Sequence, residues 1–156
     1  MTPRQRLAAK IGAGAVALVL PVVMLYEGTV FRSYKDPADI VTVCTGHTGS
    51  DVKMGQSYTK AQCEELLYRD LLQHADALAC IRVPLTDHQR AAFLSFAFNV
   101  GNGAFCKSTL VRKANAGDIT GACAELSRWT MAGGRELPGL VKRRAAERQL
   151  CEQGLT

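Results

Sequence analysis

The sequence lacks several patterns that would assign it quickly to a class of enzyme or binding protein. It has no C-x-x-C pair, no glycine-rich phosphate loop, no nucleophile elbow and no metal-binding motif. It also has no internal repeat, no low-complexity tract and no Pro/Ser-rich linker. These absences argue against zinc ribbons and thiol redox sites, and we expect no cofactor and no metal. The 156 residues, 47% of them hydrophobic, are enough for one domain with a core.

The chain carries a formal net charge of +5, and a basic surface favours polyanionic partners. Nucleic acid, anionic lipid and a cell wall rich in carboxylates all fit that description. No dense row of lysines and arginines alternates with aromatic residues, so we do not expect nucleic acid as a partner. The one compact basic cluster, formed by Lys142, Arg143 and Arg144, is typical of a solvated helix face.

An even number of cysteines is spread along this small chain, which predicts disulfides and an oxidising compartment. The alternative is a cytosolic protein with reduced, buried thiols. The sequence does not choose among the possible pairings. Our default is nearest-neighbour pairing, which joins Cys44 with Cys63, Cys80 with Cys106, and Cys123 with Cys151.

Residues 11–26 form an uncharged apolar segment that Glu27 follows. The basic residues Arg4, Arg6 and Lys10 precede it, which predicts that the N-terminus stays in the cytoplasm while the rest crosses a membrane. The segment is shorter than the about 20 strongly apolar residues of a permanent span, and it is rich in glycine and alanine. It ends without a small-x-small cleavage site. A weak anchor, a cleaved signal peptide and a buried core helix all remain open, and a released anchor can also become a core helix.

The remaining pattern predicts an α+β fold, with one small antiparallel sheet followed by a helical bundle. Segments rich in β-branched and aromatic residues flank a polar turn, which predicts a hairpin. Capping boxes at Thr59 and Thr86 begin two helical patterns, and the second is apolar nearly all round, as expected for a central buried helix. The expected strands cover 29–35 and 40–45, with a third near 46–49, and the expected helices cover 59–80, 86–100, 108–116, 118–129 and 138–151.

Three residues near the hairpin have the chemistry that glycoside hydrolysis needs. Glu27 ends the apolar segment, Asp36 lies nine residues later in the hairpin turn, and Thr42 lies six further on in the second strand. The reaction needs one protonated carboxyl to donate to the leaving oxygen and one ionised carboxylate. An apolar setting favours the neutral carboxyl, so Glu27 is the candidate acid, Asp36 the candidate carboxylate and Thr42 the candidate to hold the water. Each residue taken alone also fits an ordinary structural place, so the spacing does not decide.

The strings around these residues resemble the T-even class of phage-type lysozymes, glycoside hydrolase family 24. SYKDPADIVTVCTGHTG follows Glu27, and the catalytic Glu, Asp and Thr of that family fall on Glu27, Asp36 and Thr42 without a gap. The likeness continues through AFLSFAFNVGNGAF and SRWTMAGG, and so covers almost the whole chain from Tyr26 onward. It implies a lysozyme-like fold with the active-site cleft between sheet and bundle. It also implies an inverting muramidase that cuts peptidoglycan between N-acetylmuramic acid and N-acetylglucosamine.

Within that family the chain is most similar to the signal-anchor-release endolysins of lambdoid phages. The resemblance implies export by the host secretion machinery and inactive tethering to the host inner membrane through residues 11–26. Release would then give an active periplasmic monomer that causes host cell lysis. We expect residues 1–28 to form the release segment and 29–156 the catalytic domain, with the released segment packed on it. Residues 11–26 contain no cysteine, so we do not expect a switch by disulfide exchange.

The sequence leaves open which arginine accompanies Glu27 and which activity the protein has. The resemblance implies an arginine close to the acid, and Arg135 and Arg143 are both candidates. The rival activities are a lytic transglycosylase, which would need Glu27 but not an ionised Asp36, and an inactive, membrane-tethered wall-binding regulator of lysis. We expect His47 to be structural, with a ring nitrogen bonded across the hairpin.

Overall fold

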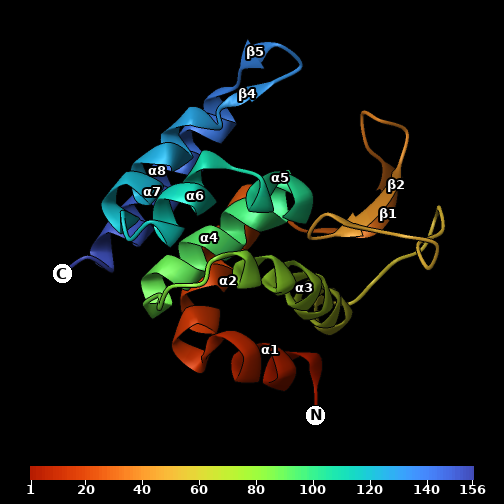
Figure 1. Cartoon of the computed structure of the whole chain (residues 1–156). Helices are drawn as coiled ribbons and strands as arrows, with labels where there is room; N and C mark the ends of the chain where they lie inside the picture. Colours follow the sequence, from red (N-terminus) through yellow and green to blue (C-terminus); the bar gives the residue numbers. More distant parts are fainter.

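The computed structural model describes all 156 residues and places a small sheet beside a group of helices around a central buried one (Figure 1). The expected α+β class is confirmed. The chain begins with two helices, α1 (Pro3–Ile11) and α2 (Ala13–Glu27). The antiparallel sheet follows, with strand order β1 (Val30–Lys35), β2 (Val41–Cys44) and β3 (His47–Thr48). The rest comprises α3 (Lys60–Ala75), α4 (Asp87–Val100), α5 (Asn102–Cys106), α6 (Thr109–Asn115), α7 (Ile119–Glu125), the short hairpin β4 (Met131–Ala132) and β5 (Arg135–Glu136), and α8 (Pro138–Gln153).

Helices α3 and α4 begin where the capping signals in the sequence predict. Thr59 and Thr86 both cap their helices through complete capping boxes, and Gly101 ends α4, as predicted. The predicted helices over 59–80 and 118–129 each end earlier and continue as 3₁₀ turns, η1 (Asp76–Cys80) and η2 (Leu126–Arg128). Helices α1 and α5 and the β4–β5 hairpin were not predicted, because short elements carry too few residues to show a period.

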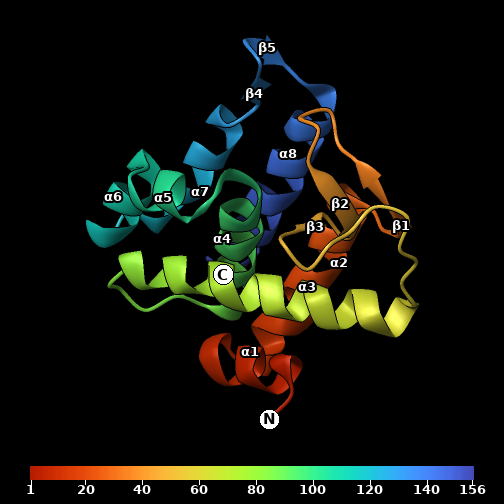
Figure 2. The ribbon, with the colours of Figure 1, turned by 90° about the vertical axis from the view of Figure 1, so that its right-hand side faces the viewer.

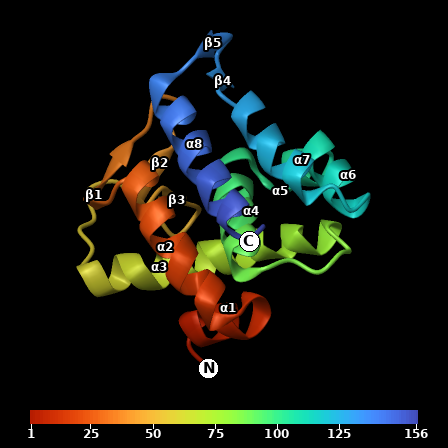
Figure 3. The same cartoon turned by 90° about the vertical axis from the view of Figure 1, so that its left-hand side faces the viewer.

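In this structure the apolar N-terminal segment is a core helix. The buried face of α2 packs against α4 and also touches α8 (Figure 3). Val16, Val19 and Val23 are all buried, and burial of each such side chain contributes about 1.5–3 kcal/mol. No single helix is long and apolar enough to cross a membrane, although α1 and α2 together pass that test as a pair bent by 114°. The segment predicted as 11–26 is therefore divided at Gly12 rather than continuous.

The bend at Gly12 is held by the first turn of α4. Gly12 has φ 93° and ψ 144°, a backbone conformation that residues with a side chain rarely adopt. Arg90 donates from Nε to the carbonyl oxygen of Ile11, at 2.8 Å, and forms an ion pair with Asp87. The Asp87 carboxylate in turn lies so close to Gly14 that a Cβ there would collide with it. Two glycines and one ion pair thus fix the direction in which α2 leaves α1.

Three disulfides connect the layers, and the nearest-neighbour pairing is confirmed. Cys44–Cys63 joins β2 to α3, Cys80–Cys106 joins η1 to α5, and Cys123–Cys151 joins α7 to α8. No free cysteine remains. Each bridge closes a loop of 19 to 28 residues, for which the loss of entropy in the unfolded chain stabilises the fold by about 3 kcal/mol.

Replacing Gly12 by alanine should destabilise the folded protein. The φ of 93° forces a Cβ into a strained conformation, at a cost of about 1–3 kcal/mol. Thermal unfolding followed by circular dichroism measures the loss. Gly139→Ala is the matched control, because a Cβ at Gly139 meets nothing within 4 Å and its φ is not positive. Equal melting temperatures for Gly12→Ala and the parent protein would contradict the strained bend.

Candidate active site

Glu27 is the last residue of α2 and lies between the sheet and α8. Its Oε1 accepts a hydrogen bond from Nη1 of Arg143, at 2.5 Å, and its side chain is 21% exposed. On the sheet side Gly46 comes close, since a Cβ there would be 3.3 Å from Oε2 of Glu27. Of the two arginines left open by the sequence, the structure brings Arg143 to Glu27, whereas Arg135 is exposed in β5.

Glu27 lines two adjoining hollows in the surface. The first, of about 270 Å³, is polar and lies between the sheet, α3 and α4. The second, of about 340 Å³, lies between α2, α4 and the start of α8. Glu27 and Asn99 line both, so an extended polymer could run past the carboxyl from one hollow to the other. The β1–β2 loop and the β4–β5 hairpin project on the same side of the molecule (Figure 2). The remaining lining residues are Gly46, Thr48, Asp70, Gln73, His74 and Phe98 in the first, and Tyr26, Leu137, Gly139, Leu140 and Arg143 in the second.

Asp36 lies in the β1–β2 turn, as expected. Its Oδ1 accepts hydrogen bonds from the backbone N–H groups of Ala38 and Ile40, at 2.8 and 2.9 Å. Both donors contact the same oxygen, and Oδ2 makes no hydrogen bond to the protein. The turn therefore fixes the carboxyl group and leaves one oxygen for another partner.

Thr42 lies in β2, opposite Tyr34 of β1 and Thr48 of β3. It is 5% exposed, and its hydroxyl donates to the carbonyl oxygen of Ile40 at 3.0 Å. No hydrogen bond joins Asp36 or Thr42 to Glu27. The structure thus positions the acid on the helix side and the other two residues on one hairpin, and the grouping of the three in catalysis stays a prediction.

The basic cluster of α8 is not a solvated face, so that prediction is wrong for two of its three members. Arg143 and Arg144 are 3% and 1% exposed, and both pair with Glu147, which is fully buried one turn later. Sequence reasoning missed Glu147, although its spacing of four and three residues from the two arginines on one helix was a usable signal. It also missed Ser95 of α4, which donates to Glu147 at 2.5 Å and gave no sequence signal at all.

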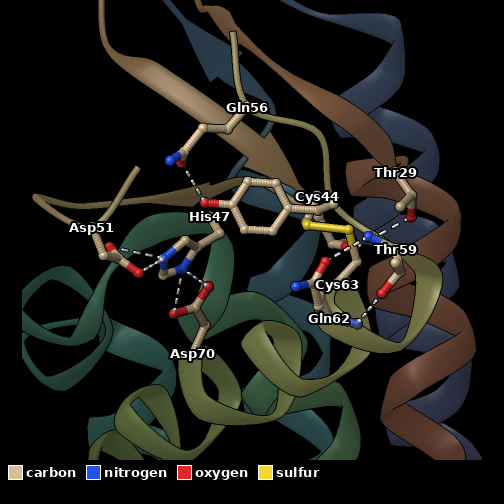
Figure 4. Close-up of a disulfide and its surroundings, with 11 residues drawn as sticks. Thr29, Cys44, His47, Asp51, Gln56, Thr59, Gln62, Cys63 and Asp70 are labelled. Carbon is tan, nitrogen blue, oxygen red and sulfur yellow. Dashed lines mark hydrogen bonds and ion pairs between the residues drawn. A yellow bond between two sulfur atoms is a disulfide. The ribbon is translucent and has the colours of Figure 1, made fainter. Parts of the chain in front are cut away.

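His47 is held between two carboxylates beside the Cys44–Cys63 disulfide (Figure 4). Its Nδ1 contacts Asp70 of α3 at 2.9 Å, and its Nε2 contacts Asp51 at 3.1 Å. The ring thus bonds to α3 and to the following loop rather than across the hairpin. Burial alone lowers the pKa of His47, but the hydrogen bonds and charges of Asp70 and Asp51 outweigh it, so the pKa is raised overall. Burial also raises the pKa of Asp70, which the contact with His47 opposes.

Known proteins share this architecture. The sequence model of the family described as phage lysozyme matches residues 24–147. A SAR-endolysin of Enterobacteria phage P21 is 44% identical over 97% of this chain and 96% of its own length. A solved structure of a P22 lysozyme point variant has a TM-score of 0.78 and 32% identity, covering 94% of this chain and 98% of that one. The active form of the P1 phage endolysin Lyz has a TM-score of 0.79 at 23% identity, covering 100% and 96%, and so shows the fold.

Raising the pH from about 6 to about 8.5 should lower the melting temperature. The pKa of His47 is raised in the folded state, so protonated His47 stabilises the fold. This stabilisation is complete below the ordinary pKa of 6.5 and is lost as the pH rises through the raised pKa of the folded state. Each kcal/mol lost should lower the melting temperature by roughly 2–4 °C. His47→Gln should be less stable at the lower pH and should flatten the dependence, whereas His88→Gln, at a histidine without an ion pair, should retain it. The same slope in the His47 variant would refute this role.

Proposed function

The chain belongs to the phage lysozyme family, and from that premise we propose that Glu27, Asp36 and Thr42 form its catalytic trio. The protein is an endolysin, a glycoside hydrolase with the lysozyme activity of its family, and peptidoglycan is its substrate. The observation that carries the assignment is the position of Glu27, which lines both hollows and contacts Arg143. The reaction is hydrolysis of the β-1,4 bond between N-acetylmuramic acid and N-acetylglucosamine.

In the proposed mechanism Glu27 donates a proton to the glycosidic oxygen as the bond breaks. Arg143 holds Oε1, so the proton leaves from Oε2, which lies on the side of the sheet. Water attacks the anomeric carbon as the glycosidic bond breaks, and Asp36 takes the proton of that water on Oδ2, the oxygen that accepts no hydrogen bond from the turn. Thr42 orients that water through the free lone pairs of its hydroxyl, whose hydrogen is engaged by Ile40.

Glu27→Gln and Asp36→Asn should each reduce clearing of purified peptidoglycan by about 10²–10⁴-fold, the range for loss of a general acid or base. The products of the parent protein should carry reducing N-acetylmuramic acid ends. Asp39→Asn is the matched control, because Asp39 is an exposed carboxylate of the same turn, and it should remain active. Anhydro ends with full activity of Asp36→Asn would indicate a lytic transglycosylase instead. A folded parent protein that does not clear the wall would leave the wall-binding alternative.

The N-terminal segment gives the activity a second level of control in this proposal. Residues 11–26 anchor the exported chain in the host inner membrane, with residues 1–10 in the cytoplasm, and then leave the bilayer to become α2 in the periplasm. The names of the relatives, SAR-endolysins, support this course. The burial of Val16, Val19 and Val23 supports it physically, because the released helix recovers apolar contacts on α4. Residues 1–28 are then the release segment and 29–156 the catalytic domain.

Ala13→Leu combined with Ala17→Leu should keep more of the chain in the membrane fraction. Each change adds three apolar carbons, at about 0.8 kcal/mol per CH₂ of burial in lipid. Both alanines are exposed in the folded protein, so the substitutions should leave the specific activity of the released enzyme unchanged. Fractionation of cells and assay of the soluble fraction measure the two effects separately. The matched control is serine at both positions, which should speed release. An unchanged distribution in both variants would contradict the weak anchor.

A further inference from the structure

The guanidinium of Arg143 is fixed on two sides before it reaches Glu27. Its Nε donates to Oε2 of Glu147 at 3.2 Å, and its Nη2 donates to the carbonyl oxygen of Ser95 at 3.0 Å. Since the guanidinium is planar, these two contacts determine where Nη1 points, and Nη1 is the atom that contacts Glu27. The orientation of Arg143 therefore depends on Glu147.

Glu147 has no contact with solvent, and its carboxylate accepts hydrogen bonds from three side chains: Arg143, Ser95 and Arg144. Its Oε2 also accepts from the hydroxyl of Ser95 at 2.5 Å, and its Oε1 pairs with Nη1 of Arg144. Arg144 is anchored in turn by the carbonyl oxygen of Trp129, at 3.0 Å, and by the side chain of Asn99. Burying a carboxylate completely carries a large desolvation cost. The charged partners and hydrogen bonds of Glu147 offset that cost.

The cluster formed by Arg143, Arg144 and Glu147 carries a net positive charge. Two buried guanidinium groups face one buried carboxylate, which leaves one unit of positive charge beside Glu27. Without Glu147, two units of positive charge would lie beside the Glu27 carboxyl group. Burial lowers the pKa of Arg144, and the charge of Glu147 opposes that change, which shows how closely these groups interact.

We propose that Glu147 is a positioning residue for the acid: it orients Arg143 toward Glu27 and limits the positive charge beside the Glu27 carboxyl group. The inference rests on the proposed role of Glu27 as the proton donor. Glu147 lies outside the cleft and acts only through Arg143 and Arg144. Glu147 does not contact the glycan itself, because it is fully buried.

Other polar and charged groups lie near Glu27. Across the first hollow α3 contributes Asp70 and His74, whereas α4 contributes the neutral Asn99 and β3 the neutral Thr48. Beside Glu27 on α2, Tyr26 approaches the Lys142 backbone through its hydroxyl. None of these groups contacts Glu147, so Glu147→Gln changes the charge near Glu27 without removing a hydrogen bond from any of them. Arg144→Gln removes one such bond, the contact of Arg144 with Asn99.

The test is the pH dependence of kcat/KM on soluble peptidoglycan at constant ionic strength. Glu147→Gln raises the charge of the cluster, so the alkaline limb of the profile should move to lower pH by about 0.5–1.5 units. Arg144→Gln lowers the charge and should move the limb to higher pH. The double variant restores the original charge, and its limb should return toward that of the parent protein even where its activity is lower.

Glu125→Gln is the matched control, because Glu125 is also a buried carboxylate with two cationic partners, Lys113 and Arg128. It should lose stability and keep the profile of the parent protein. If Glu147→Gln does not fold, the upward shift in Arg144→Gln decides, and its absence overturns the proposal. Superimposable profiles in folded variants overturn it as well. If Glu27→Gln is active, the proposed function has failed; if it is inactive and the profiles coincide, only the role of Glu147 has failed.

Discussion

The packing of α2 on α4 determines where Glu27 lies, because Glu27 is the last residue of that helix. Three valines on the inner face of α2 are buried, and the helix ends within reach of Arg143 on α8. The start of the same helix is held at Gly12 by Arg90 and Asp87 of α4. One helix thus contributes both to the hydrophobic core and to the candidate active site. A chain in which α2 is elsewhere, such as in a bilayer, has neither the complete core nor Glu27 in place.

The buried charges follow from that arrangement. Arg143 reaches Glu27 from inside the protein, so its charge must be compensated there, and Glu147 provides a carboxylate that serves Arg143 and Arg144 together. The sheet supplies the opposite wall, with Gly46 close to Glu27 and with Asp36 fixed by its own turn. His47 ties this sheet to α3 through Asp70, and Cys44–Cys63 ties β2 to the same helix. The two walls of the cleft are therefore attached to the core by separate contacts.

Local signals in the sequence predicted the parts of this structure that local chemistry decides. The capping boxes at Thr59 and Thr86, the hairpin and the apolar central helix all appear where they were expected. The bend at Gly12 was not predicted, because it depends on Arg90 and Asp87, which are far away in sequence. The burial of Arg143 and Arg144 was missed for the same reason. A charged residue in a sequence is expected to be exposed to solvent. Only the packing of α8 on α4 shows that the side chains of these two arginines face inward.

We propose that the cleft beside Glu27 is complete only when α2 has left the bilayer and packed on α4. The most direct measurement reconstitutes the purified full-length chain in vesicles of host phospholipid and follows peptidoglycan cleavage while the chain is released. We expect the rate of cleavage to rise in proportion to the soluble fraction, and we expect chains that sediment with the vesicles to contribute none. Cleavage by the vesicle-bound fraction at the specific activity of the soluble one would contradict it.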